Sequence, residues 1–229
     1  IPIAERQFRI HLSSINKALL DYYVQLLKRV HLNPSVVHLG PFSDLNLLKS
    51  ENEYSDSLSI LLDVGPTSAD IAILKGGNII ALRTALLSNK SFFDGYFRDS
   101  LSFEACEQVS KSISQNILNE IQNALSFCNE VDSNEAVETI YLFGGSHFSN
   151  PLSILLEKET GVETAIYSYP IENDEESVFD GPPNVIDTAI GLGLAGVNAA
   201  KDQLNFLPPE LKPKRKSFLP ALFGGALKI

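Results

Sequence analysis

The feature that most constrains the fold is a pair of apolar runs that meet at an Asp-x-Gly turn. The runs cover residues 59–64 and 68–74, and Asp63-Val64-Gly65 stands where the first run ends. A second turn at 75–78 leads into a third apolar run at 79–83. Short apolar runs between turn residues are typical of buried strands, and glycine permits the backbone conformations that tight turns need. We therefore predict three consecutive strands over residues 58–84.

The first of these turns has the chemistry of an anion site. Its backbone N–H groups and the hydroxyls of Thr67 and Ser68 are suited to a phosphate, and Asp63 is suited to hold a cation through water. The alternative is a purely structural turn, in which Gly65 only reverses the chain, because a single Asp-x-Gly is a short motif.

Composition excludes several classes of function. The formal net charge of −10 argues against nonspecific binding to nucleic acid or to an anionic membrane over most of the surface. The two cysteines, Cys106 and Cys128, fall 22 residues apart in one predicted helix, so about 33 Å separates them and they cannot pair. Free thiols in a reducing compartment are expected. The four histidines are scattered, so we predict no metal site.

The sequence has no pattern typical of a secreted or membrane-spanning protein. No apolar run reaches the ~18 residues of a membrane span, and no signal-peptide pattern opens the sequence. The chain starts at Ile1 and contains no methionine, so we expect a piece of a longer protein.

Helical and strand patterns alternate along the chain, which predicts an α/β fold with a mixed central sheet flanked by helices 14–31 and 102–129. Ser13-Ser14 is the expected N-cap of the first helix, and Ser102 that of the second. The long helix has an apolar stripe for the core at Cys106, Val109, Ile113, Ile117, Ile121, Ala124 and Cys128. The other expected elements are strand 35–39, helix 42–48, strand 139–143, helix 150–159 with Pro151 at its first position, strand 162–167, an acidic loop at 171–183 and a small-residue helix at 185–197.

The last 29 residues change in character, from acidic to basic. They contain six Lys or Arg against two acids, with a Lys/Arg cluster at 212–216 before an apolar end. We predict that residue 217 onward begins or adjoins a membrane-inserted segment in the intact protein, because basic flanks favour the cytoplasmic side. One alternative is a flexible basic tail, and another is a tail that folds back on the domain with Phe206 and Leu207 as anchors.

The order of these parts resembles the second domain of the actin-like ATPase superfamily, over about residues 10–200. We therefore expect the ribonuclease H-like fold of that superfamily over residues 1–200, followed by a basic, Pro-rich tail at 201–229. The resemblance implies that the hairpin turn is the second phosphate loop and that the Gly-Gly after strand 139–143 lets the backbone approach adenosine. The candidate nucleotide-binding residues are then Asp63, Gly65, Thr67, Ser68, Gly144, Gly145 and Ser146.

Within that superfamily the chain resembles the PilM-like proteins of type IV pilus assembly and their type II secretion relatives. The motifs that carry the resemblance are Leu26–Pro34, Leu62–Gly65, Arg83, Phe103–Glu107 and Ala189–Ala195. Asn205-Phe206-Leu207-Pro208 is similar to the Asn-x-Leu-Pro segment with which the partner PilN begins.

The PilM-like resemblance implies a cytoplasmic scaffold at the inner membrane that binds PilN-like assembly proteins and no nucleic acid. The candidate partner-binding or membrane-binding residues are Asn205, Phe206, Leu207, Pro208, Lys212, Lys214, Arg215 and Lys216.

The alternative function is an ATP-binding or ATP-hydrolysing enzyme of the actin or sugar-kinase type. No Walker motif or Ser-His-Asp pattern is present, the hairpin offers only Asp63 and Asp70 as carboxylates, and we assign no catalytic residue. PilM-like sequences carry a glycine pair where this chain has residues 85–88, and no Asp-x-Gly hairpin precedes residue 63. We therefore expect no cofactor in this chain alone, with ATP and Mg²⁺ as cofactors only of a full-length protein.

Overall fold

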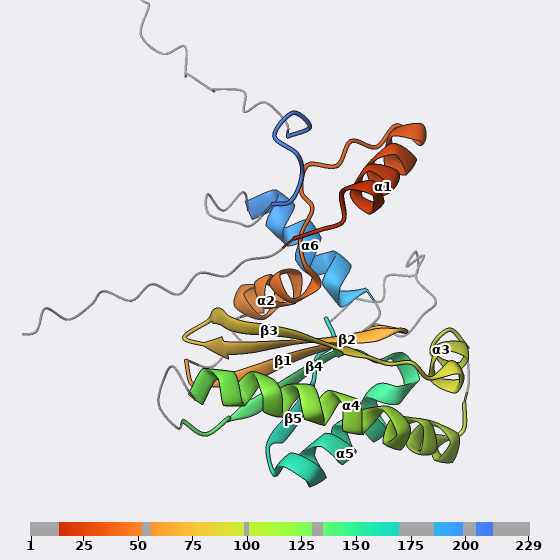
Figure 1. The fold of residues 1–229 in the computed structure, drawn as a ribbon, viewed down its shortest axis with the longest axis vertical. Helices are drawn as coiled ribbons and strands as arrows, with labels where there is room; N and C mark the ends of the chain where they lie inside the picture. Colours follow the sequence, from red (N-terminus) through yellow and green to blue (C-terminus); the bar gives the residue numbers. More distant parts are fainter. Residues whose placement is uncertain are drawn as a thin grey trace, which may run out of the picture. The chain divides into compact units, whose positions relative to one another are not determined.

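The computed structural model describes residues 14–51, 56–98, 101–129, 135–169, 186–198 and 205–212. The chain divides into two compact units, one of residues 38–203 and one that joins residues 1–37 to residues 204–229. The larger unit contains the sheet (Figure 1).

The sheet of the larger unit has five strands in the order β3-β2-β1-β4-β5. β1 is antiparallel to β2, and β2 to β3, whereas β4 runs parallel to β1 and to β5. The predicted mixed sheet built on the 58–84 strands is therefore confirmed. The strands are β1 (Ser59–Val64), β2 (Ser68–Lys75), β3 (Asn78–Leu86), β4 (Thr139–Gly144) and β5 (Glu163–Ile166).

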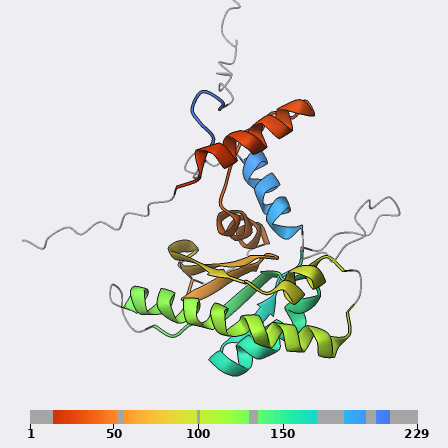
Figure 2. The same cartoon turned by 45° about the vertical axis from the view of Figure 1, so that its right-hand side comes forward.

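Helices cover both faces of this sheet (Figures 1 and 2). Helices α4 (Phe103–Asn129) and α5 (Ser149–Thr160) pack on one face, and α2 (Gly40–Glu51) and α6 (Asp187–Asn198) pack on the other. Short helices α3 (Lys90–Tyr96) and η1 (Ser146–Phe148) complete the unit. Because side chains alternate along a strand, Leu62 and Val64 of β1 join the core under α4, whereas Leu61 joins the core under α2.

The long helix α4 follows the prediction closely. It is one helix, and the Ala105 N–H donates to the Ser102 hydroxyl over 3.3 Å at its start. The predicted stripe is buried in the core under α4, with Val109 partly buried, and neither cysteine forms a disulfide. Helical periodicity therefore identified the packing face correctly.

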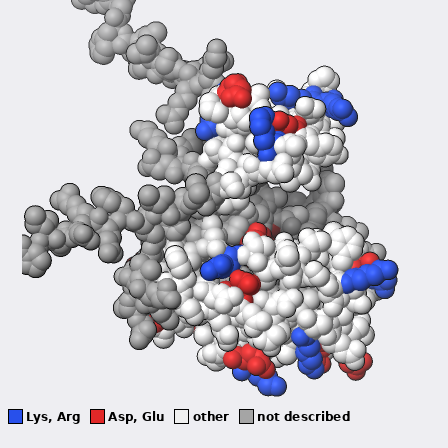
Figure 3. Space-filling view, in the orientation of Figure 1, with Lys and Arg blue, Asp and Glu red and all other residues white. Residues whose placement is uncertain are grey.

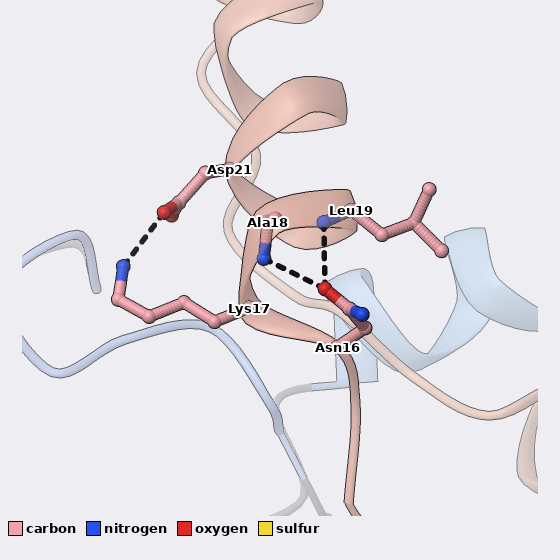
Figure 4. A network of polar contacts seen from close by, with 5 residues as sticks. All are labelled: Asn16, Lys17, Ala18, Leu19 and Asp21. Carbon is pink, nitrogen blue, oxygen red and sulfur yellow. Dashed lines mark hydrogen bonds and ion pairs between the residues drawn. The ribbon is translucent and has the colours of Figure 1, made fainter.

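Helix α1 (Lys17–Arg29) belongs to the smaller unit, not to the unit that contains the sheet. The expectation that helix 14–31 flanks the sheet is wrong, since its buried residues, Leu20 and Val24, pack with Leu207 and belong to neither core of the sheet. The N-cap is Asn16 instead of Ser13-Ser14, because its Oδ1 accepts from the N–H groups of Ala18 and Leu19 over 2.9 and 3.2 Å. Lys17 and Asp21 form an ion pair of 2.7 Å one turn apart (Figure 4).

Other boundaries also differ from the prediction. Residues 35–39 do not form a sheet strand, because backbone groups of Ser35 and Val37 bond to Asn205 and Phe206 instead. Helix α2 begins at Gly40, and Pro151 stands third in α5, where its missing N–H is still tolerated. No helix in the described ranges is long and apolar enough to cross a membrane. The predicted acidic loop at 171–183 and the segment from 217 onward lie outside the described residues.

Candidate functional site

The sheet brings the two predicted glycine turns together at one edge. β1 and β4 are parallel with Val64 opposite Gly144, so the turn after β1 and the turn after β4 lie side by side. The Gly145 N–H donates to the Val64 carbonyl over 2.8 Å and joins the two turns. All the candidate nucleotide-binding residues, from Asp63 to Ser68 and from Gly144 to Ser146, therefore gather at the carboxyl ends of β1 and β4.

The turn after β1 is closed by its own backbone. The Gly65 N–H donates to the Ser68 carbonyl over 2.9 Å, which uses this donor within the turn. The Leu87 N–H donates to the Thr67 carbonyl over 2.9 Å. β3 extends through Ala85 and Leu86, which stand opposite Ala69 and Ser68 of β2. The residues that replace the glycine pair of PilM-like sequences thus lengthen the hairpin beside the turn.

The turn after β4 requires glycine. Gly144 and Gly145 have φ of +66° and +76°, and Ser146 follows with φ of +51°. A Cβ atom on Gly144 would lie 2.6 Å from the Val64 carbonyl oxygen and 3.1 Å from Oδ1 of Asp63. Gly144 therefore allows the Asp63 carboxylate and the end of β1 to approach the backbone of β4.

Asp63 lies between two glycines at this edge. A Cβ atom on Gly40, at the start of α2, would lie 3.1 Å from Oδ2 of Asp63, on the opposite side of the carboxylate from Gly144. Burial, and next the charges of Asp70 and Asp187, raise the pKa of Asp63 to about 6, and the Thr188 hydroxyl acts in the opposite direction. The fold therefore buries the Asp63 carboxyl at this edge although burial disfavours its ionised form.

Two further carboxylates near Asp63 were not predicted from the sequence. Asp44 of α2 is fully buried, and no hydrogen bond of good geometry reaches either of its oxygens. Burial, and next the charge of Asp63, raise the pKa of Asp44 well above its usual value. Asp187 of α6 accepts from the Tyr169 N–H over 2.9 Å, and burial raises its pKa to about 6.

Asp44, Asp63 and Asp187, the carboxylate cluster, come from a helix, a strand and a second helix. Asp187 raises the pKa of both other members through its charge. A signal for Asp44 was available, because it lies among Pro41, Leu45 and Leu48 on the buried face of α2. No group of three potential metal ligands in the described part of the chain has the arrangement of a metal site. Strongly perturbed carboxyls at a sheet edge are nonetheless a mark of functional sites.

Asp70, the other hairpin carboxylate, is engaged in the sheet. Its Oδ1 accepts from the Thr84 hydroxyl over 2.7 Å across the β2–β3 pair. Its charge raises the pKa of Asp63, so it contributes to the electrostatics of the carboxylate cluster from one strand away.

The second group of candidate residues, around Asn205, lies in the smaller unit. Asn205 bonds to the backbone of residues 35–37, and Leu207 is buried in a cluster with Leu20 and Val24 of α1. Of the predicted basic residues, Lys212 is exposed, and Lys214, Arg215 and Lys216 lie outside the described residues. On the face that Figure 3 shows, Lys and Arg are interspersed with Asp and Glu, so the described residues there form no continuous basic surface.

Comparison of this fold with solved structures identifies its relatives. A structure described as "PilM-PilN type IV pilus biogenesis complex" matches with a TM-score of 0.58 and 25% identity over 78% of this chain. The chain has the actin-like ATPase fold and resembles PilM. The ethanolamine utilization protein EutJ from Carboxydothermus hydrogenoformans shares the fold, with a TM-score of 0.50 and 13% identity over 79% of this chain.

The likeness covers only part of these relatives. The chain spans 57% of the matched chain of the PilM-PilN structure and 62% of EutJ. No protein-family model matches the sequence, and no curated protein matches it either. The predicted actin-like fold and the PilM resemblance are confirmed.

Proposed function

We propose that this chain is the partner-binding part of a PilM-like scaffold in a type IV pilus or type II secretion assembly platform. The observation that carries the proposal is the 25% identity to the PilM-PilN complex over 78% of the chain, with a TM-score of 0.58. The matched structure is itself a complex between an actin-like protein and a second protein, which supports a PilN-like partner here. In this proposal the chain acts by binding other proteins and performs no chemistry.

The proposed place of the scaffold is the cytoplasmic face of the inner membrane. The support is the basic cluster from Lys212 to Lys216, followed by the apolar residues 218–223. Each basic residue near an anionic bilayer adds about 1 kcal/mol of attraction. The tail would then hold the actin-like unit near the bilayer in which its partner is inserted.

Copurification tests the proposed partner. The full-length protein, tagged, is coexpressed with the PilN-like membrane protein of the same organism and purified in mild detergent. We expect the two proteins to elute together in a fixed ratio. An unrelated single-span protein of the same organism serves as the control and should not copurify. Elution of the tagged protein without the PilN-like protein would refute the scaffold proposal.

ATP binding by the full-length protein is a second candidate function, and the edge that holds Asp63 favours it. A carboxylate beside two glycine turns, at the carboxyl ends of parallel strands, is suited to orient the water shell of a Mg²⁺ ion on a nucleotide. Asp63 would orient that shell, and the hydroxyls of Thr67 and Ser68 would face the phosphates.

Calorimetric titration with Mg-ATP tests the nucleotide proposal. We expect the 229-residue chain to bind weakly or not at all and the full-length protein to bind more tightly, since the chain spans 57% of the matched PilM chain. Titration with Mg²⁺ alone is the control. Low-micromolar affinity for the 229-residue chain would show that one half of the fold suffices. Absence of binding by the full-length protein would leave the scaffold function alone.

A further inference from the structure

A cavity of about 330 Å³, the α4–α5 groove, lies between α4, the end of α5 and the amino ends of β1 and β4. This volume falls within the range of about 300–1,000 Å³ that small-molecule sites occupy. The groove is separate from the Asp63 edge. Ile60, which lines the groove, stands at the amino end of β1 and faces the core under α4, whereas Asp63 stands near the carboxyl end and on the opposite face.

The floor of the α4–α5 groove is apolar. Ile60 of β1 and Ile140 of β4 stand opposite each other in the sheet, and both are buried. Two buried residues of α4 complete the floor, and three partly buried residues form the walls: Leu118, Ile121, Leu125, Val137 and Val162. An apolar group that enters the groove leaves water for a hydrocarbon surface, which the hydrophobic effect favours.

The groove follows one face of α4. Its residues on this helix run from Gln115 to Leu125, a rise of about 15 Å along the helix axis. Gln115 and Gln122 are exposed on the α4 side of the mouth. Nε2 of Gln115 donates to Oδ1 of Asn119 over 2.9 Å, which leaves its carbonyl oxygen as an acceptor. The length of the groove therefore suits an elongated ligand.

The α5 side of the mouth presents acceptors. Glu159 has an exposed carboxylate, which only accepts, and no ion pair or hydrogen bond among the residues that the structure describes engages it. The Thr160 hydroxyl donates to the Leu156 carbonyl over 2.6 Å and accepts from the Val162 N–H over 3.2 Å, so it keeps only an acceptor lone pair. An ammonium group, which has only donors, matches this side of the mouth.

The charges around the mouth favour the same kind of head group. The last turn of α5 carries Glu157 and Glu159 against Lys158 alone. The carboxyl end of a helix has a partial negative charge, so a cation bound there is stabilised and the two glutamates are not. Glu163, at the start of β5, adds another exposed carboxylate nearby in the chain.

We infer that the α4–α5 groove binds an elongated amphipathic organic cation. The apolar body of this ligand lies against Ile60, Ile121 and Ile140, and its ammonium head donates to the Glu159 carboxylate. The inference does not rest on the scaffold proposal or on the nucleotide proposal, because none of the candidate residues of either lines the groove.

Methyl NMR tests this inference on the 229-residue chain, isotopically labelled at the δ1 methyls of isoleucine. The protein is titrated separately with octylammonium and with octanoate, which have similar apolar bodies and opposite charges. We expect octylammonium to shift the signals of Ile60, Ile121 and Ile140 and to leave that of Ile190, on the other face of the sheet, unchanged. Octanoate should bind about fivefold more weakly, since an exposed ion pair contributes at most about this factor.

Three variants separate the head group from the apolar body. Glu159→Gln should remove the preference for octylammonium and leave binding to the floor. Glu157→Gln is the matched control, because Glu157 is exposed in the same helical turn but does not line the groove, and it should keep the preference. Val162→Phe enlarges a wall residue and should abolish the isoleucine shifts with both probes.

Circular dichroism and thermal unfolding show whether each variant is folded. Should Val162→Phe fail to fold, Leu125→Phe narrows the groove from the α4 side instead. Octylammonium that shifts none of Ile60, Ile121 and Ile140, or wild-type protein that binds the two probes equally, would overturn the inference. It would also be overturned if Glu159→Gln kept the wild-type preference or if Glu157→Gln lost it to the same extent.

Discussion

Neutralising Asp63 should stabilise the protein above pH 6 and leave its stability unchanged below pH 4. Its pKa in the folded state is about 6, against a usual value of 3.8, because burial and the charges of Asp70 and Asp187 disfavour its ionised form. Between pH 3.8 and about pH 6, the folded state therefore binds more protons than the unfolded state. The free energy of unfolding must then fall as the pH rises from about 4 to about 6.

The size of the effect follows from the two pKa values. At about 1.4 kcal/mol per pKa unit, the difference between 3.8 and about 6 corresponds to about 3 kcal/mol for Asp63 alone. Asp63→Asn keeps the shape of the side chain and removes the charge, so this penalty should disappear. The charge of Asp63 also contributes, after burial, to the raised pKa of Asp44, so the variant should lower the pKa of that second buried carboxyl as well.

Urea unfolding followed by circular dichroism at pH 3.5, 5, 6.5 and 8 measures this difference. We expect Asp63→Asn and wild type to be equally stable at pH 3.5 and to diverge by about 3 kcal/mol at pH 8. Glu107→Gln is the matched control, because its exposed pair with Lys111 on α4 is worth under about 1 kcal/mol at any pH. The reasoning is refuted if wild-type stability rises between pH 4 and 6.5, or if Asp63→Asn keeps the wild-type pH dependence.

Three further predictions use matched positions or the intact protein. Gly191→Ala should lower the free energy of unfolding, measured in urea, by about 3 kcal/mol, since a Cβ there would overlap the Ser43 carbonyl. Gly193→Ala has open space and should stabilise α6 by about 0.5–1 kcal/mol. Equal effects of the two variants would contradict the close α2–α6 contact. Gly144→Ala should lower the free energy of unfolding by about 3 kcal/mol and Gly161→Ala by about 1 kcal/mol. Both glycines have positive φ, but only a Cβ on Gly144 would meet the Val64 carbonyl. A Gly144→Ala protein no less stable than Gly161→Ala would argue against this contact. Full-length protein should stay with membranes through high-salt and carbonate washes, and release by salt alone would leave only a peripheral basic tail.

Much of the larger unit could be predicted from local sequence. Short apolar runs between turn residues specify β1 to β3, and steps of three and four along the helix specify the buried stripe of α4. The glycines after β1 and β4 were also recognisable, since positive φ at Gly144 and Gly145 is a local requirement. The sequence by itself thus determined the strands, the principal core helix and the turns that follow β1 and β4.

Tertiary structure alone decided which distant residues meet. Asp44 shares a face of α2 with Leu45 and Leu48, but only the packing of α2 on the sheet brings its buried carboxyl near Asp63. Residues 35–37 have the composition of a strand, yet they bond to Asn205, whose side chain reaches Val37 across 168 positions of sequence. Local pattern fixes the conformation of a segment but not its partner, because the partner is chosen by burial and hydrogen bonding across the whole fold.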